Sequence, residues 1–183
     1  MSPKNFINHT NDLIKEYFDD NSRIVVLEGG KTRNDTLINA IDYINDNFDI
    51  NDDSIIVTHD SVRPFVTHRI IEDNIKAAKE FGACDTVVPA TDTIVESVDS
   101  KLIKNIPIRD NYYQGQTPQS FKINKLSELI NSLSESESNI LTDACKIFVL
   151  KGEDVYLVKG EITNIKITYP YDLKLANTIL KEI

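Results

Sequence analysis

The chain has 183 residues, 29 acidic and 20 basic side chains, and a formal net charge of −9. This length suits one domain, residues 1–183, and a hydrophobic content of 40% excludes a mainly disordered state. No apolar run is long enough for a membrane helix, the acidic balance argues against a nucleic-acid partner, and the two cysteines lack companion metal ligands, so we expect a cytoplasmic protein.

The first half of the chain alternates apolar strands with helical periodicity. Strands are expected at residues 23–28, 54–58 and 85–90, and helices at 34–48 and 67–81. Thr67 is a suitable N-cap for the second of these helices, and Gly82 ends it. This alternation is typical of a mostly parallel sheet with helices on its faces.

The middle of the chain has a different pattern. Three alternating segments at residues 93–98, 102–108 and 110–116, with turn residues between the first two, predict an antiparallel β-arm over about residues 92–115. The remaining elements are expected to be helices at 124–133 and 142–150, strands at 154–158 and 164–168, and a last helix beginning at Pro170. Together these elements predict a Rossmann-like three-layer α/β/α sandwich with an inserted β-arm.

Polar motifs follow several of the predicted strands, where ligands bind in open α/β sheets. The GGKTR segment after the first strand could receive an anion, although its glycines could equally serve the turn alone. In the HDSVRP segment, Asp60 could hold Mg²⁺ while Arg63 neutralises phosphate, or the two could form a solvated ion pair. We read His59 as structural.

Two further basic residues interrupt such patterns. Arg109 lies near the arm, and Lys166 interrupts the alternation of the predicted strand at 164–168, where an exposed lysine is the commoner explanation. Three of the five arginines, Arg33, Arg63 and Arg109, fall in these motifs. An acidic protein that binds polyanions has to concentrate its cations locally, so this distribution suggests a phosphorylated ligand.

In chain order, the segments GGKTR, VTHDSVRPF, TDT, QTPQSF, TDA and NIKIT resemble those of the cytidylyltransferases that activate sugar and polyol phosphates. The HDSVRPF, YQGQTPQSF, DACKI and PYDLKLAN segments resemble the branch that acts on ribitol 5-phosphate more than the 2-C-methyl-D-erythritol 4-phosphate branch of isoprenoid synthesis. The resemblance implies transfer of CMP from CTP to D-ribitol 5-phosphate, which gives CDP-ribitol for cell-wall or capsule polymers. The alternative acceptor is 2-C-methyl-D-erythritol 4-phosphate.

The resemblance also implies roles for individual residues. The nucleotide would contact Gly30, Arg33, Thr36, Asp60, Ser61, Arg63 and Lys166. The acceptor would contact Thr93, Arg109, Thr117 and Thr142. Asp60, Lys166 and Arg109 would take part in catalysis, Asp60 would hold Mg²⁺, and the arm would exchange between the two subunits of a homodimer.

One departure from the family concerns the N-terminus. The family opens with a strand and a glycine-rich loop that wraps the triphosphate, whereas this sequence begins at what resembles the family's second helix. We therefore expect an N-terminally truncated fold. Preorganised cations in such a loop supply much of the transition-state stabilisation, so its absence would weaken or abolish the activity. A further alternative follows, in which the chain is a non-catalytic remnant that acts as a binding or dimerisation module.

Overall fold

The computed structural model of the protein describes residues 1–19, 22–134, 136–137 and 143–182. Its contacts divide the chain into two units, which are Met1–Ser54 with Ile123–Glu153, and Ile55–Lys122 with Asp154–Ile183. We call them the helical unit and the sheet unit. Of the helices in the described ranges, none is both long and apolar enough to cross a membrane. The prediction of one domain over residues 1–183 stays a prediction.

The helical unit contains α1 (Ile7–Tyr17), α2 (Arg33–Asn47), α4 (Ile123–Asn131) and α6 (Cys145–Leu150) after a short 3₁₀ turn, η1 (Lys4–Phe6). The helix predicted at 34–48 is confirmed, and it begins with a capping box between Thr32 and Asp35. The helices predicted at 124–133 and 142–150 correspond to α4 and the described part of α6.

The strand predicted at residues 23–28 does not form. The described backbone there makes only an isolated parallel bridge between Ser2 and Glu28. Ile24 and Val25 remain 39% and 49% exposed, so the apolar run lacks the neighbouring strands that would bury it. The prediction was wrong because β-propensity mainly reflects packing against partner strands, and a single bridge provides little of it.

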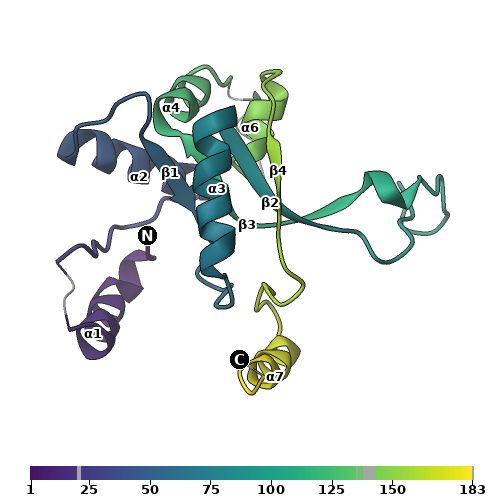
Figure 1. The fold of residues 1–183 in the computed structure, drawn as a ribbon, viewed down its shortest axis with the longest axis horizontal. Helices are drawn as coiled ribbons and strands as arrows, with labels where there is room; N and C mark the ends of the chain where they lie inside the picture. Colours follow the sequence, from purple (N-terminus) through teal and green to yellow (C-terminus); the bar gives the residue numbers. More distant parts are fainter. Residues whose placement is uncertain (20–21, 135, 138–142, 183) are drawn as a thin grey trace. The chain divides into compact units, whose positions relative to one another are not determined.

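The sheet unit contains β1 (Ile55–Thr58), β2 (Ala83–Pro89), β3 (Tyr113–Lys122) and β4 (Tyr156–Lys159), in the spatial order β1-β3-β2-β4 (Figure 1). β3 is antiparallel to both β1 and β2, and β4 is parallel to β2. Three of the four strands therefore share one direction and β3 runs against them. The predicted α/β class is confirmed, but the open sheet is mixed rather than mostly parallel, because two of its three strand pairings are antiparallel.

Helix α3 (His68–Phe81) packs against this sheet. The helix follows its sequence signals, since Thr67 caps its first turn and Gly82 ends it with a φ of 89°. Ala77 and Ala78 of α3 form a buried core cluster with Cys84 of β2 and Val158 of β4. The last helix, α7 (Pro170–Ile179), begins at the proline that predicted it.

The arm leaves the sheet after β2 and returns through η2 (Arg109–Asn111) into β3, and it extends well away from the sheet in Figure 1. The predicted strands at 93–98 and 102–108 are reduced to one antiparallel bridge between Glu96 and Asn105. The strand predicted at 110–116 begins only at Tyr113 and continues to Lys122. Six aliphatic side chains of the arm are exposed rather than packed, which explains why its backbone pairing is so short.

The strand predicted at 164–168 also does not form, and these residues follow β4 as a loop. Ile167 N–H donates to Val62 O at 2.9 Å, and Asn164 is held by side-chain contacts described below. Alternating hydrophobicity predicted a strand here, but these irregular hydrogen bonds replace the regular ladder that a strand requires.

Candidate functional site

One edge of the sheet collects the chemistry-bearing loops of the sheet unit. The C-terminal ends of β1, β2 and β4 meet there with the N-terminal end of β3, as the strand directions require. Three segments leave this edge, which are the 59–63 loop after β1, the arm after β2, and the 160–168 loop after β4. Ligands bind at this position in open α/β sheets, so the strand directions place the candidate site here.

Asp60, Arg63 and Lys166 form an ionic cluster at this edge, which we call the edge cluster. Asp60 Oδ2 lies 3.0 Å from Lys166 Nζ and 3.6 Å from Arg63 Nε. The side chains of Asp60 and Arg63 are 16% and 11% exposed, whereas that of Lys166 is 43% exposed. The cluster therefore has a protected carboxylate and one cation that reaches solvent, where it can meet an anionic ligand.

The 59–63 loop is fixed by hydrogen bonds to β3 and to itself. Asp60 N–H donates to Thr117 Oγ1 at 3.1 Å, and Thr117 Oγ1 lies 2.9 Å from His59 Nδ1. His59 Nε2 lies 2.9 Å from Arg63 O, and because a carbonyl only accepts, Nε2 must carry the proton. With that tautomer, Nδ1 accepts from the Thr117 hydroxyl, so His59 links the two ends of the loop that carries Asp60 and Arg63.

The 160–168 loop is tied to α3 at its beginning. Arg69 binds Glu161 Oε1 through Nη2 at 2.8 Å and donates from Nη1 to Lys159 O at 3.1 Å. The hydrogen bond that Arg69 donates to Glu161 raises the pKa of Arg69; burial opposes this rise and Asp73 adds to it. Thr67 Oγ1 also donates to Glu161 Oε1 at 3.1 Å. The loop that carries Lys166 is thus anchored to the first turn of α3.

Gly160 allows this loop to pass close to β3. A Cβ at Gly160 would overlap Gln116 Oε1 and would lie 2.9 Å from Thr86 Cγ2. The absence of a side chain therefore leaves room for the Gln116 carboxamide, which donates from Nε2 to Glu161 O at 2.9 Å. A larger residue would have to displace that carboxamide from the loop.

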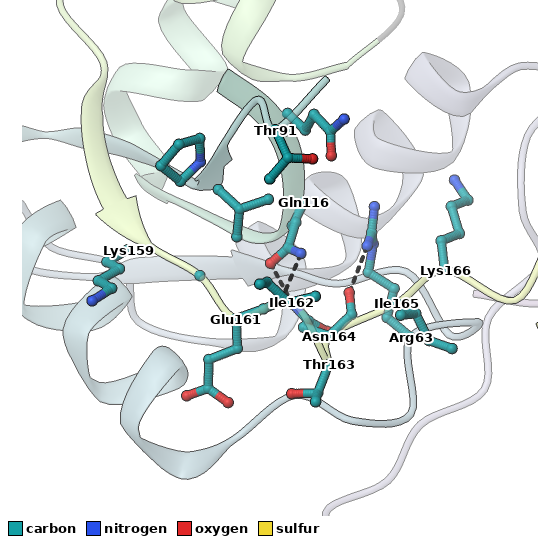
Figure 2. Close-up of a pocket in the computed structure, with 15 residues that line it drawn as sticks. Arg63, Thr91, Gln116, Lys159, Glu161, Ile162, Thr163, Asn164, Ile165 and Lys166 are labelled. Atoms are coloured by element: carbon teal, nitrogen blue, oxygen red, sulfur yellow. Dashed lines mark hydrogen bonds between the residues drawn. The ribbon is translucent and has the colours of Figure 1, made fainter. Parts of the chain in front are cut away.

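A pocket of about 760 Å³ opens beside these segments (Figure 2). Its wall combines Arg63 and Lys166 with apolar side chains of β2 and the 160–168 loop, which are Val88, Pro89, Ile162 and Ile165. Figure 2 shows Arg63 of the 59–63 loop and Lys166 of the 160–168 loop extending in a similar direction, with Asn164 between Gln116 and Arg63. The lining also includes Lys159 and Glu161. A wall with three cations, one carboxylate and an apolar surface suits a phosphorylated ligand that has a carbon skeleton.

The other residues predicted on the sheet unit lie around this edge or on the arm. Arg109 belongs to η2, and its Nη1 donates to Thr91 O at 3.1 Å, which places it at the base of the arm. Thr117 contacts the 59–63 loop through its hydroxyl, as described above. Ser61 is exposed on that loop, and Thr93 is exposed on the arm. The structure therefore brings Thr117 to the edge cluster, whereas Thr93 lies on the arm.

Three predicted nucleotide contacts belong to the helical unit. Gly30 N–H donates to Thr36 Oγ1 at 2.9 Å, and Arg33 is the first residue of α2. A Cβ at Gly30 would lie 2.6 Å from the carbonyl carbon of Asp35, so the turn itself requires glycine there. This supports the geometric explanation of Gly30 that the sequence left open. Thr142 lies outside the described residues.

Sequence reasoning missed Asn164 and Gln116 as parts of the site. Asn164 is fully buried, with no exposed area, and its Nδ2 donates to Gln116 Oε1 at 3.2 Å and to Thr117 O at 2.8 Å. The backbone carbonyl of Asn164 accepts a hydrogen bond from Arg63 Nη1 at 2.8 Å. The available signal was a polar residue two positions before Lys166, but its partners are 47 and 48 residues away in the sequence.

In the described part of the chain, no group of three or more His, Cys, Asp or Glu side chains could hold a metal ion by itself. Any divalent cation at the edge cluster would therefore rely on Asp60 and on oxygen atoms that a ligand or water supplies. This donor set suits Mg²⁺, which commonly binds one carboxylate together with phosphates and water.

Comparison with known proteins agrees with this geometry. A family model described as IspD, 2-C-methyl-D-erythritol 4-phosphate cytidylyltransferase, matches residues 3–182. The fold is similar to that of 4-diphosphocytidyl-2C-methyl-D-erythritol synthase from Anaerococcus prevotii, with a TM-score of 0.81 and 25% identity over 98% of this chain and 78% of the other.

Two further solved structures carry the cytidylyltransferase name. The protein from Thermus thermophilus is 29% identical, with a TM-score of 0.72 over 86% of this chain and 73% of its own. The protein from Francisella tularensis is 28% identical, with a TM-score of 0.77 over 88% of this chain and 74% of its own. The predicted absence of a glycine-rich loop stays a prediction. The match over residues 3–182 shows that the chain belongs to the 2-C-methyl-D-erythritol 4-phosphate cytidylyltransferase family, whose members are nucleotidyltransferases that use CTP and a sugar phosphate.

Proposed function

We propose that this chain transfers CMP from CTP to 2-C-methyl-D-erythritol 4-phosphate. The observation that carries the proposal is the edge cluster beside the pocket, in a chain whose family model covers residues 3–182. The family and three structural neighbours are named for the methylerythritol reaction, and they give no support to the ribitol 5-phosphate preference that the sequence wording suggested. The alternative acceptor of the sequence analysis is therefore the better choice.

The reaction needs positioning and positive charge more than a general base. An acceptor phosphate monoester has its second pKa near 6, so at neutral pH its oxygen is already an anionic nucleophile. That oxygen forms a bond to the α-phosphorus of CTP, and the bond from this phosphorus to the bridging oxygen of pyrophosphate breaks. Lys166 and Arg63 draw the two polyanions together at the edge and offset their repulsion.

Asp60 is the residue that would hold Mg²⁺ in this proposal. Its carboxylate is largely protected from solvent and is held in place by the backbone bond to Thr117, which suits a fixed ligand. The bound ion would neutralise charge on the phosphates. Arg109 and Thr93 are proposed to contact the acceptor phosphate from the arm.

The test is pyrophosphate release by the purified chain with CTP and Mg²⁺, with the two acceptors in parallel. The proposal predicts a higher kcat/KM with 2-C-methyl-D-erythritol 4-phosphate than with D-ribitol 5-phosphate. A preference for ribitol 5-phosphate would restore the other branch. Failure with both acceptors, in a chain that is folded by circular dichroism, would favour a non-catalytic binding module.

We also propose that the arm forms a homodimer. Its exposed aliphatic side chains are Val95, Val98, Leu102, Ile103, Ile106 and Ile108. Such a concentration of apolar surface is typical of an interaction site. Light scattering should give twice the chain mass, and the double substitution Val98→Asp with Leu102→Asp should halve it. Val149→Asp, at an exposed position of α6, is the control and should leave the mass unchanged. A parent chain that is monomeric at micromolar concentration would contradict the dimer.

A further inference from the structure

We propose that Asn164 is a positioning residue that sets the distance between Lys166, Arg63 and Asp60. The proposal concerns the cytidylyl transfer proposed above and rests on it for its activity readout. Asn164 lies two residues before Lys166 in the lining of the pocket, yet its own side chain is fully buried and is bonded to Gln116 of β3 (Figure 2). It acts on the edge cluster only through the residues that it binds.

The Asn164 carboxamide fixes the 160–168 loop to β3. Its two Nδ2 hydrogens are both used, one by Gln116 Oε1 and one by Thr117 O. The Gln116 carboxamide in turn donates to Glu161 O. The Asn164 and Gln116 carboxamides therefore hold the loop to β3 at residues 161 and 164. The orientation of both carboxamides is fixed, because each hydrogen bond needs a donor that faces an acceptor.

The backbone of Asn164 links the same loop to Arg63. Arg63 Nη1 donates to Asn164 O at 2.8 Å while Arg63 Nε faces Asp60 Oδ2 at 3.6 Å. On the other side of Lys166, Ile167 N–H donates to Val62 O at 2.9 Å. Lys166 is thus flanked on both sides by hydrogen bonds to the 59–63 loop. The side-chain bonds of Asn164 to β3 fix the position of the two loops relative to the sheet.

Thr117 of β3 connects the Asn164 side chain to the loop that carries Asp60. Thr117 receives the Asn164 side chain at its carbonyl and the Asp60 backbone N–H at its hydroxyl. The carboxylate and both cations of the edge cluster are therefore placed relative to one dipeptide, Gln116–Thr117. A displacement of the loop by one ångström changes the position of Lys166 relative to Asp60, and misplacements of this size typically cost about 100-fold in rate.

The structure provides a matched control in Asn74. Asn74 and Asn164 are both fully buried, and both use Nδ2 for two hydrogen bonds. Asn74 binds Ile70 O and Thr86 Oγ1 beneath α3, and within the described part of the chain its side chain has no direct hydrogen bond to the 160–168 loop or the edge cluster. The same change of amide to carboxylate therefore removes donors from equally buried sites, one tied to the edge cluster and one not.

The experiment compares Asn164→Asp with Asn74→Asp in the full chain, at a temperature where each is folded. Both should lower the melting temperature. Per folded molecule, we expect Asn164→Asp to lower kcat by about 100-fold, with a smaller change in KM for either substrate, and Asn74→Asp to leave kcat within about threefold of the parent. Equal kcat for the two variants would overturn the proposal, because it would reduce Asn164 to a purely structural role.

A second readout does not depend on turnover. Hydrogen exchange of the Ile167 amide, measured by NMR, should become faster in Asn164→Asp relative to the core amides of β2, and should follow the core amides in Asn74→Asp. Unchanged relative protection at Ile167 would overturn the proposal even if the parent is inactive. A parent that lacks turnover but shows this exchange pattern would contradict only the proposed function.

If Asn164→Asp does not fold, Gln116→Glu examines the same network from β3. It keeps an acceptor for Asn164 and removes the donor to Glu161 O. The same loss of kcat and the same faster exchange at Ile167 are expected. Parent-like values in this folded variant would overturn the proposal.

Discussion

The two fully buried asparagines of the sheet unit sit in regions built in different ways. Beneath α3, Asn74 donates twice, and its Oδ1 accepts from Ser120 Oγ and Cys84 Sγ, each at 3.3 Å. At the sheet edge, Asn164 also donates twice, but its Oδ1 has no hydrogen-bond partner among the described residues. Arg63 Nε, in the same network, likewise has none.

This difference indicates what each region is organised to do. The Asn74 network satisfies its polar atoms and holds a helix against a sheet, so its effect is stability. In the Asn164 network the buried Asn164 Oδ1 lacks a hydrogen bond and Arg63 Nε has only its 3.6 Å ion pair with Asp60, and missing hydrogen bonds of this kind cost stability. Because a cost of this kind is retained where a site needs a fixed arrangement of groups, the edge network is better explained by the placement of charges than by folding.

The largest expected effect comes from the carboxylate that the edge network holds. Asp60→Asn keeps the shape of the side chain but removes its charge next to Lys166 and Arg63. We expect kcat to fall by about 1,000-fold, as is typical when a preorganised charge is lost. The melting temperature should also fall, because the largely buried Arg63 loses the carboxylate that pairs with it, so kcat is compared per folded molecule. Asp154→Asn, at an exposed position of the same unit, is the control for a general charge effect. Full activity in Asp60→Asn would remove Asp60 from the chemistry.

In the region beneath α3, the buried Cys84 thiol should make the free energy of unfolding depend on pH. Burial raises the pKa of the Cys84 thiol from its ordinary value of 9.0 to about 11. The unfolded thiol therefore ionises first as the pH rises above 9, so stability is present below that pH and is lost towards pH 11. We expect a loss of about 2 kcal/mol that disappears in Cys84→Ala, measured by urea unfolding at pH 8 to 11. A loss of the same size in the variant would place its origin elsewhere.

Gly160→Ala tests the edge network without altering a polar group. The added methyl would overlap Gln116 Oε1, so the Gln116 carboxamide must move away from Glu161 O. We expect kcat to fall by about tenfold and stability to fall by about 1 kcal/mol. Gly152→Ala is the matched control, since Gly152 has a φ of 75° and an open environment, and it should lose stability alone. An unchanged kcat in Gly160→Ala would separate the Gln116 carboxamide from the chemistry.

The smallest effect is expected where the loop is tied to α3. Arg69→Met removes the pair with Glu161, but the arginine side chain is 43% exposed, and exposed pairs contribute little. We expect a two- to threefold loss of kcat and a stability change below about 1 kcal/mol. Asp73→Asn removes the other ion pair of Arg69 and should leave kcat unchanged. A loss as large as that of Asn164→Asp would shift the positioning role towards α3.

The sequence predicted elements whose signals are local. Helix α3 has its cap, its periodicity and its terminal glycine within one segment, and the structure agrees at both ends. The edge cluster needed more, because Asp60 and Lys166 are 106 positions apart (166 − 60) and only the direction of the strands brings them to one edge. The resemblance to a family named both residues, whereas composition and spacing alone left an exposed lysine as the commoner explanation.

Other features depend on tertiary contacts that no local pattern contains. Residues 164–168 alternate like a strand, but hydrogen bonds from Asn164 and Ile167 to distant segments keep them as a loop. Residues 23–28 are as apolar as a core strand, yet Ser2 and Glu28 make only an isolated bridge. In both cases the available partner strands, rather than intrinsic propensity, decided the conformation.

The central claim is tested most directly by the product of the reaction. A phosphorus NMR spectrum of the chain incubated with CTP, Mg²⁺ and 2-C-methyl-D-erythritol 4-phosphate should show loss of the acceptor phosphomonoester, and a new pair of diphosphate resonances in step with free pyrophosphate. The account predicts this spectrum for the parent and its near absence for Asp60→Asn. An unchanged spectrum of the folded parent, or CMP and pyrophosphate without a new diphosphate, would contradict it.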